Sequence, residues 1–483
     1  MLKSCKENWR KPVSSNTEKT RKSLGVVAVV PFWSHSQNLN LDSNYAYLRI
    51  VLPELSRLSP DTLWLMYFPS PESGKWHYTP DGLISEKIKL IKWPYQDGMM
   101  NSIRHFDVNR WREIERDFSP TVYWLHQVEM CSQLSGGGID SNYADMSLPT
   151  LVAQHHYIIH KSLPYPLESQ TPRRLLQTVG TIAADRVVFN SDHCRKMARE
   201  SFGELLSAST LEEIERKSET LRFGLLTGSE PKAEIKEGAR PVVIYNHRFE
   251  SYKQPKVTFA QLDELKKRHK FETWVTQVKG QSTKAFKFDR VVFGATREAY
   301  LKNIAVAGVN TLNSVHETFC ISALDSLAVG HLLVAPRRCT FPELVPADYP
   351  FLFENDREQL EMLDHIFSTW PREFHAWSSR LRSHALENFS LTTYSEKYLD
   401  LLESAESARY VTEPSEKLAA SLDQACQSVM LGQTISLEEL FRRRDALFVL
   451  RNQAFTRRRM IREAIKRGLS PVWRDGVCLT RRA

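Results

Sequence analysis

Short apolar runs recur along this chain of 483 residues, and most of them end in a polar loop followed by a helical pattern. Uninterrupted apolar runs of this length are typical of parallel strands that are buried on both faces. Their alternation with helical segments predicts an α/β fold with parallel sheets, and such sheets bind ligands beyond the carboxyl ends of their strands. The runs lie at 24–31, 62–68, 121–125, 151–156, 186–191, 241–245, 271–276, 290–294 and 331–335.

The length of the chain allows two or three domains with sizeable cores. Glu, Lys, Ser and Gly are enriched between about 205 and 240, and we interpret this stretch as the end of one domain and a linker. The prediction is a flexible basic arm, two Rossmann-like domains and a basic helical extension without strands. Their ranges are 1–23, 24–235, 236–405 and 406–483.

The seven cysteines are scattered and form no C-x-x-C pair, which favours reduced thiols in the cytoplasm over disulfides or a zinc site. The first 23 residues lack the apolar core of a signal peptide. No apolar run approaches the roughly 20 residues that a membrane span needs. We therefore expect a cytoplasmic protein without a membrane span.

The positive charge is concentrated at the two ends of the chain. Residues 438–483 hold twelve Arg and one Lys against five acids, a surplus of 13 − 5 = +8, and residues 1–22 hold seven basic residues against two acids. A basic terminus suggests contact with a polyanion such as nucleic acid, although a solvated basic face is the open alternative.

Within the basic tail, Ser436 and Glu439 form a capping box that predicts a helix from about Leu437. Two readings remain open: a helical hairpin docked on the core with a solvated basic face, or a surface whose arginines bind the phosphates of a nucleic acid, which we favour. The arginines of the predicted nucleic-acid surface are Arg442, Arg443, Arg444, Arg451, Arg457, Arg458, Arg459 and Arg462.

Two acidic residues flank the start and the middle of an apolar helix pattern in the segment 313–355. Glu317 opens a turn, the helix pattern covers 321–328, and Asp325 lies eight residues after Glu317. A carboxylate at a helix start can bind ligand hydroxyls, while the free amides and the helix dipole attract phosphate. The segment therefore predicts a site for a ligand that carries both groups.

A basic loop directly follows the apolar run at 241–245. Arg248 and Lys253 in this loop can bind a diphosphate, Arg248 through forked hydrogen bonds and Lys253 as a point charge. A basic loop after a strand is common, so this prediction depends on its combination with the segment 313–355.

The acid-x7-acid pattern of Glu317 and Asp325 resembles the donor-binding signature of retaining GT-B glycosyltransferases. Four segments are similar, more narrowly, to the transferases that mannosylate queuosine in tRNA. They are Val187–Ser191, Asn246–Pro255, Val315–Phe319 and Phe341–Tyr349.

This resemblance implies a GT-B fold with the active site between two Rossmann-like domains and a metal-independent, retaining transfer from a nucleotide sugar. It implies that Arg248 and Lys253 stabilise the leaving diphosphate, that Glu317 binds sugar hydroxyls and that Asp325 binds the ribose. His126 matches a histidine that faces the donor sugar, although a hydrogen-bonded structural histidine is the open alternative. Thr318, Phe319 and Cys320 complete the predicted donor site.

The sequence departs from this family in two places. The second acid is Asp325 where Glu is usual, and the early glycine-rich turn is replaced by 31–35, which keeps only Ser-His. The shorter reach of Asp325 bears on the ribose contact. The altered turn and the added basic helices favour hydroxymethylated pyrimidine in DNA as the acceptor, as in phage DNA glycosyltransferases. A queuosine-like tRNA nucleoside is the alternative, and the favoured donor is UDP-glucose, with GDP-mannose second. A non-catalytic nucleic-acid-binding protein and a lipid or glycan transferase also remain open.

Overall fold

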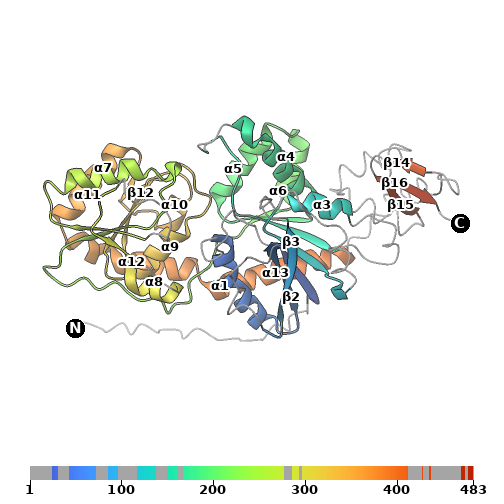
Figure 1. Cartoon of the computed structure of the whole chain (residues 1–483), viewed down its shortest axis with the longest axis horizontal. Coiled ribbons are helices and arrows are strands. Elements are labelled where there is room, and N and C mark those ends of the chain that lie inside the picture. Colours follow the sequence, from blue (N-terminus) through green and yellow to red (C-terminus); the bar gives the residue numbers. More distant parts are fainter. Residues whose placement is uncertain are drawn as a thin grey trace, which may run out of the picture.

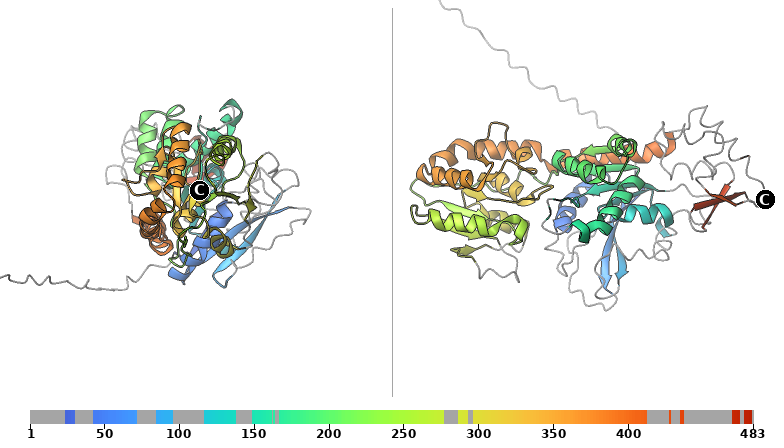
Figure 2. Two further views of the ribbon diagram at one scale, coloured as in Figure 1. Left: turned by 90° about the vertical axis from the view of Figure 1, so that its left-hand side faces the viewer. Right: turned by 90° about the horizontal axis from the view of Figure 1, so that it is seen from above.

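The computed structural model describes two α/β domains that lie side by side and a small separate sheet formed near the C-terminus (Figures 1 and 2). Within the described part, no helix is long and apolar enough to cross a membrane. The described residues are 24–30, 43–71, 85–95, 117–137, 149–161, 163, 167–276, 286–292, 296–411, 427, 434–436, 469–473 and 477–481.

The first domain is built on a parallel sheet with the strand order β3-β2-β1-β4-β5-β6-β7. The order reverses between β1 and β4, and the carboxyl end of such a switch point is where open α/β sheets bind ligands. The strands are β1 (Val26–Val30), β2 (Leu63–Pro71), β3 (Ile88–Tyr95), β4 (Val122–Leu125), β5 (Thr150–His155), β6 (Arg186–Phe189) and β7 (Ser218–Thr220).

The second domain has a parallel sheet with the order β10-β9-β8-β11-β12-β13. Its order reverses between β8 and β11, so the loops that follow these two strands meet at one edge. Those loops carry the basic residues after 245 and the acidic segment after 313. The strands are β8 (Val242–Tyr245), β9 (Glu272–Val275), β10 (Arg290–Val291), β11 (Val309–Thr311), β12 (Leu332–Pro336) and β13 (Leu352–Phe353).

Helices pack on both sheets, and several begin at a side chain that caps the first turn, as Ser191, Ser207, Thr296 and Asn355 do. In the first domain they are α1 (Ser43–Leu58), α3 (Met130–Gly137), α4 (Leu167–Ala183), α5 (Asp192–Gly203) and α6 (Ala208–Arg216). Later in the chain they are α7 (Pro255–Leu265), α8 (Arg297–Ile304), α9 (Ile321–Val329), α10 (Phe341–Leu344), α11 (Asp356–Ser368), α12 (Arg372–Asn388) and α13 (Leu391–Val411).

Helix α13 follows the second domain in sequence but packs on the first domain, beside α1 (Figure 1). Its Tyr394 hydroxyl lies 2.6 Å from that of Tyr47, and its Tyr398 hydroxyl donates to Gln154 at 2.7 Å. The chain crosses back where Gly224 touches Ser390: a Cβ at Gly224 would lie 2.2 Å from the Ser390 carbonyl oxygen. The predicted domain boundary at 405 therefore falls inside a helix that belongs to the first domain.

The stretch 205–240 begins with α6 and β7, the last elements of the first domain before the connecting segment, in agreement with its interpretation as a domain end followed by a linker. One sequence-based prediction is corrected. The extension after 406 is not purely helical, because β14 (Thr434–Ser436), β15 (Leu469–Trp473) and β16 (Val477–Arg481) pair as an antiparallel sheet. The helix predicted from Leu437 lies outside the described residues.

All nine apolar runs that predicted strands are strands in the structure, and the predicted α/β architecture with two parallel sheets is confirmed. Within the two parallel sheets, four described strands were missed: β3, β7, β11 and β13. β13 has two residues, and β7 and β11 have three residues each and include polar ones. β7, β11 and β13 are too short to give a detectable apolar run, and two lysines and a proline interrupt the apolar residues of β3, IKLIKWPY.

Gly224→Ala should destabilise the protein by about 1–3 kcal/mol, because the added methyl overlaps the backbone of Ser390 at the crossover. Thermal and urea unfolding would measure the loss. Gly203→Ala is the matched control, since the nearest atom to its Cβ is a Leu211 side-chain carbon at 3.7 Å. An unchanged Gly224→Ala protein would contradict the close approach of the two segments.

Candidate active site

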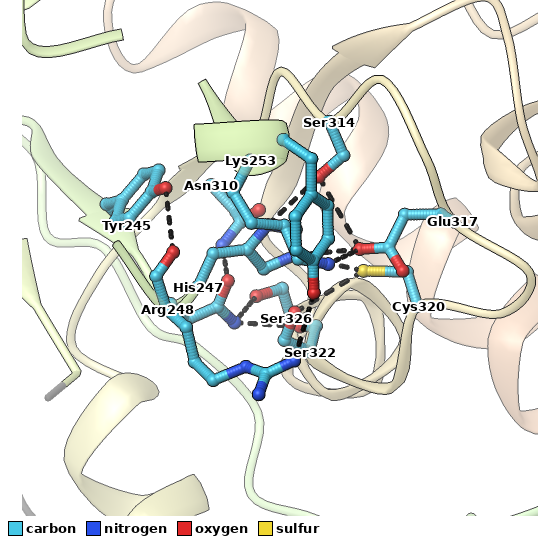
Figure 3. Close-up of polar contacts among 12 residues, drawn as sticks. Tyr245, His247, Arg248, Lys253, Asn310, Ser314, Glu317, Cys320, Ser322 and Ser326 are labelled. Carbon is cyan, nitrogen blue, oxygen red and sulfur yellow. Dashed lines mark hydrogen bonds and ion pairs between the residues drawn. The ribbon is translucent and has the colours of Figure 1, made fainter. Parts of the chain in front are cut away.

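The loops after β8 and β11 are joined by a network of buried side-chain amides and hydroxyls (Figure 3). Asn246, at the end of β8, donates to the Ser322 carbonyl at 2.8 Å and lies 3.1 Å from the Ser326 hydroxyl. Asn310 in β11 donates to the Asn246 side-chain oxygen at 2.7 Å. This network fixes the basic loop against the first turns of α9.

Lys253 and Glu317 form a buried ion pair where the two loops meet (Figure 3). Only 9% of the Lys253 side chain and 11% of the Glu317 side chain are exposed. Lys253 ends a single 3-10 turn, and Gln254 with φ of +51° then redirects the chain into α7, which begins at Pro255. The structure thus brings together two residues that the sequence predicted for one site, 64 positions apart.

His247 connects the same two loops and lies between Ser314 and Cys320 (Figure 3). Its Nδ1 is 3.2 Å from the Ser314 hydroxyl, and its Nε2 is 3.1 Å from the Cys320 sulfur and 3.8 Å from a Glu317 oxygen. Burial lowers the pKa of His247 well below its usual value, and the charges of Lys253 and Arg248 lower it further. The imidazole is therefore neutral and acts as a hydrogen-bonded spacer, a role that the sequence motif did not reveal.

His247, Glu317 and Cys320 place three potential metal ligands within 4.8 Å of one another. Three ligands of these types could hold zinc. However, the Lys253 ammonium already pairs with the Glu317 carboxylate, and His247 is held by the Cys320 sulfur and the Ser314 hydroxyl. We therefore interpret the cluster as hydrogen-bonded support for Glu317.

Among the predicted site residues that the structure describes, Arg248 is the most accessible, with 55% of its side chain exposed. Its guanidinium donates to the Tyr252 hydroxyl at 3.0 Å and lies 3.1 Å from Glu250. Since more than half of the side chain is exposed, a ligand can approach the guanidinium from solvent.

Helix α9 begins directly beside the Lys253–Glu317 pair. Its N-cap residue, Cys320, makes no side-chain cap hydrogen bond, and the helix ends at Gly330, whose φ is +92°. The uncapped amides and the helix dipole attract negative charge, and Lys253 adds a positive charge next to them. The arrangement is suited to binding an anionic group.

Thr318 and Phe319 direct their side chains toward the first domain instead of a ligand. The Thr318 hydroxyl donates to the His156 carbonyl at 2.6 Å, and the Phe319 ring centroid lies 5.0 Å from that of Phe223. Thr318 and Phe319 could therefore contact a ligand only through their backbone groups.

Asp325 is buried and engaged by Arg297 of α8, with 2.6 Å between the charged atoms. Burial raises the pKa of Asp325, and the nearby guanidinium partly opposes this rise. The acid that the family resemblance assigns to ribose therefore already has a cationic partner, which the sequence did not indicate.

His126 lies inside a buried group of aromatic rings at the carboxyl end of β4. Its Nδ1 is 2.6 Å from Nε2 of His156, and its ring centroid is 4.4 Å from that of Trp124 and 5.6 Å from that of Tyr47. Burial lowers the pKa of His126 well below its usual value, with a smaller contribution from His156. This environment fits the alternative that His126 is a hydrogen-bonded structural residue. A role of His126 in contacting the donor sugar stays a prediction.

The arginines predicted to bind nucleic acid, Arg442 to Arg462, lie outside the described residues. The other predicted site residues follow β8, follow β11 or lie in α9 of the second domain, except His126, which follows β4 of the first domain.

No protein-family model and no curated protein matches the sequence. The structure is similar to several solved glycosyltransferase structures. A sucrose-phosphate synthase from Thermosynechococcus elongatus superposes with a TM-score of 0.60 at 12% identity, over 80% of this chain and 100% of the other. The fold is GT-B.

Two further solved structures share this fold. Anabaena HepE in complex with UDP and glucose gives a TM-score of 0.55 at 14% identity, covering 78% of this chain and 99% of the other. A glycosyltransferase from Rickettsia africae gives 0.56 at 13%, covering 80% and 99%. At these identities the similarity establishes the GT-B fold, and it confirms the fold class that the sequence predicted.

Lys253→Met should destabilise the protein by roughly 3–5 kcal/mol at neutral pH, because it leaves the buried Glu317 carboxylate without its partner. Urea unfolding at pH 7 would measure the loss, with Lys253→Met/Glu317→Gln as the charge-free control. The double variant should recover part of the lost stability, because it leaves no unpaired buried charge. Equal losses in Lys253→Met and in the double variant would argue against the ion pair.

Proposed function

We propose that this protein is a retaining glycosyltransferase that moves a hexose from a nucleotide sugar to a nucleic-acid acceptor. The observation that carries the proposal is the Lys253–Glu317 pair at the uncapped start of α9, beside the exposed Arg248. One GT-B protein with a similar structure, Anabaena HepE, is described in complex with UDP and glucose. This supports UDP-glucose as the favoured donor, with GDP-mannose as the alternative.

The second domain would bind the donor. Arg248 would bind the diphosphate by forked hydrogen bonds and Lys253 by its charge, together with the first amides of α9. These groups stabilise the charge that develops on the departing diphosphate, which is where electrostatic catalysis is most effective. Glu317 would accept hydrogen bonds from sugar hydroxyls through the oxygen that Lys253 leaves free.

The acceptor hydroxyl would attack from the face that the diphosphate leaves, and a leaving phosphate oxygen would take its proton. This route uses no enzymic base, in keeping with the lowered pKa values of the buried His247 and His126, which make both imidazoles weak bases. It also needs no metal, since Arg248, Lys253 and the helix start supply the positive charge.

Asp325 would contact the ribose only by sharing its carboxylate with Arg297. Asp has a shorter reach than the Glu usual in the family, and Arg297 adds donors on the same side. We therefore assign ribose binding to the Asp325–Arg297 pair instead of to the acid alone.

The basic ends of the chain favour a nucleic acid as acceptor, in the cytoplasm. Hydroxymethylated pyrimidine in DNA is the first candidate, and a duplex base would have to be flipped into the site. A queuosine-like tRNA nucleoside is the second, because the motifs around Arg248 and Glu317 resemble that group of transferases. Two further alternatives are a non-catalytic nucleic-acid-binding protein and a lipid or glycan transferase.

The acceptor can be identified by incubating the protein with UDP-glucose or GDP-mannose and either hydroxymethylpyrimidine DNA or bulk tRNA. Mass spectrometry of the digested nucleosides should show a hexose on one acceptor, and on the DNA base if the first candidate is correct. Absence of hexose from both nucleic acids would rule out the nucleic-acid assignment.

Arg248→Ala and Glu317→Gln should each lower the turnover rate by about 10²–10³-fold, the usual cost of one lost electrostatic contact in a transition state. Donor hydrolysis or transfer would be measured under saturating nucleotide sugar. Arg357→Ala is the control, since Arg357 is exposed on α11 and pairs only with Glu361 among the described residues. Full activity in Arg248→Ala and Glu317→Gln would remove these residues from the mechanism.

A further inference from the structure

A carboxylate of the second domain caps a helix of the first domain. Glu343 lies in α10, and its two oxygens accept hydrogen bonds from the backbone amides of Asp192 at 3.0 Å and His193 at 2.8 Å. These amides open α5, where a negative charge is favoured by the helix dipole. The contact joins residues about 150 positions apart and crosses between the domains.

Arg222 completes this contact from the segment that connects the two domains. Its Nε donates to Glu343 at 3.2 Å, and its Nη2 donates to the Asp192 carboxylate at 2.6 Å. The arginine thus offsets the repulsion between two acids held at one helix start. Only 15% of the Glu343 side chain is exposed, compared with 43% of the Arg222 side chain. Solvent therefore screens the hydrogen bonds of Glu343 only in part.

The same helix start contacts the loop between β11 and α9, which carries Glu317 and Thr318 and is called the donor loop below. The Ser191 hydroxyl caps α5 by accepting from the Cys194 amide at 2.9 Å, and it also donates to the Thr318 carbonyl. The Thr318 hydroxyl donates to the His156 carbonyl at 2.6 Å. The peptide that follows Glu317 is therefore held from the first domain at two points.

We propose that Glu343 is a positioning residue that latches the two domains and thereby fixes the donor loop at Thr318. Through α5 it holds Ser191 in place, and Ser191 orients the Thr318–Phe319 peptide next to Glu317. The effect on catalysis rests on the proposed function, whereas the latch itself rests on the hydrogen bonds. The apolar packing of Phe319 against Phe223 and Phe389 is the competing explanation for how the loop is held.

The latch predicts that donor binding and transfer respond differently to its loss. Arg248, Lys253 and the start of α9 all belong to the second domain, so UDP should still bind to a Glu343→Leu protein within about threefold of wild type. The transfer rate should fall at least tenfold, because the donor loop loses its alignment with the first domain. Glu343→Gln keeps one acceptor oxygen and should show an intermediate rate.

Hydrogen–deuterium exchange tests the latch on the full-length protein. In Glu343→Leu, the amides at 192–194 should exchange at least tenfold faster than in wild type, and Glu343→Gln should lie between. Glu361→Leu, at an exposed position of α11, is the control and should leave these amides unchanged. Ser191→Ala should speed exchange near Thr318 while keeping the bonds between Glu343 and the Asp192 and His193 amides.

The outcomes separate the two proposals. Unchanged exchange at 192–194 in Glu343→Leu overturns the latch, and changed exchange with an unchanged transfer rate overturns its positioning role. If wild-type protein transfers no hexose to any acceptor tested and does not bind UDP, the proposed function fails, while the exchange measurement still decides whether Glu343 latches the domains.

Discussion

The ion pair between Lys253 and Glu317 is the interaction on which the candidate site depends. It joins the loops after β8 and β11, the two strands between which the order of the second sheet reverses. A buried charge without a partner costs several kcal/mol, so each residue requires the other in the folded protein. His247 and Asn246 then hold the two loops in register, which leaves the start of α9 and Arg248 available for an anionic ligand.

The second constraint is how the two domains are held relative to each other. Helix α13 returns to the first domain, where Tyr394 and Tyr398 bond to α1 and β5, so both ends of the second domain are tied to the first. Nearer the site, Thr318 and Glu343 make hydrogen bonds across the domain boundary. These hydrogen bonds therefore hold the two domains together directly beside the candidate site.

The sequence predicted the sheets well because nine of the strands in the two parallel sheets are apolar runs. It also predicted that Lys253 and Glu317 share a site, because the basic loop and the acid-x7-acid segment together resemble the donor site of retaining GT-B glycosyltransferases. The switch point between β8 and β11, which brings these two loops together, became visible only in the structure. It could not predict that Arg297 engages Asp325 or that rings bury His126, because these contacts join segments without a shared local pattern. Strand β11 was missed because Asn310, buried and bonded to Asn246, interrupts its apolar character. The return of α13 depends on the close approach at Gly224, which only the folded chain reveals.

A structure of the protein with bound UDP-glucose would test the central claim most directly. The account predicts the diphosphate at the start of α9 within hydrogen-bonding distance of Arg248 and Lys253, and sugar hydroxyls within hydrogen-bonding distance of Glu317. A nucleotide sugar bound elsewhere, with the Lys253–Glu317 pair intact and no ligand at α9, would contradict it.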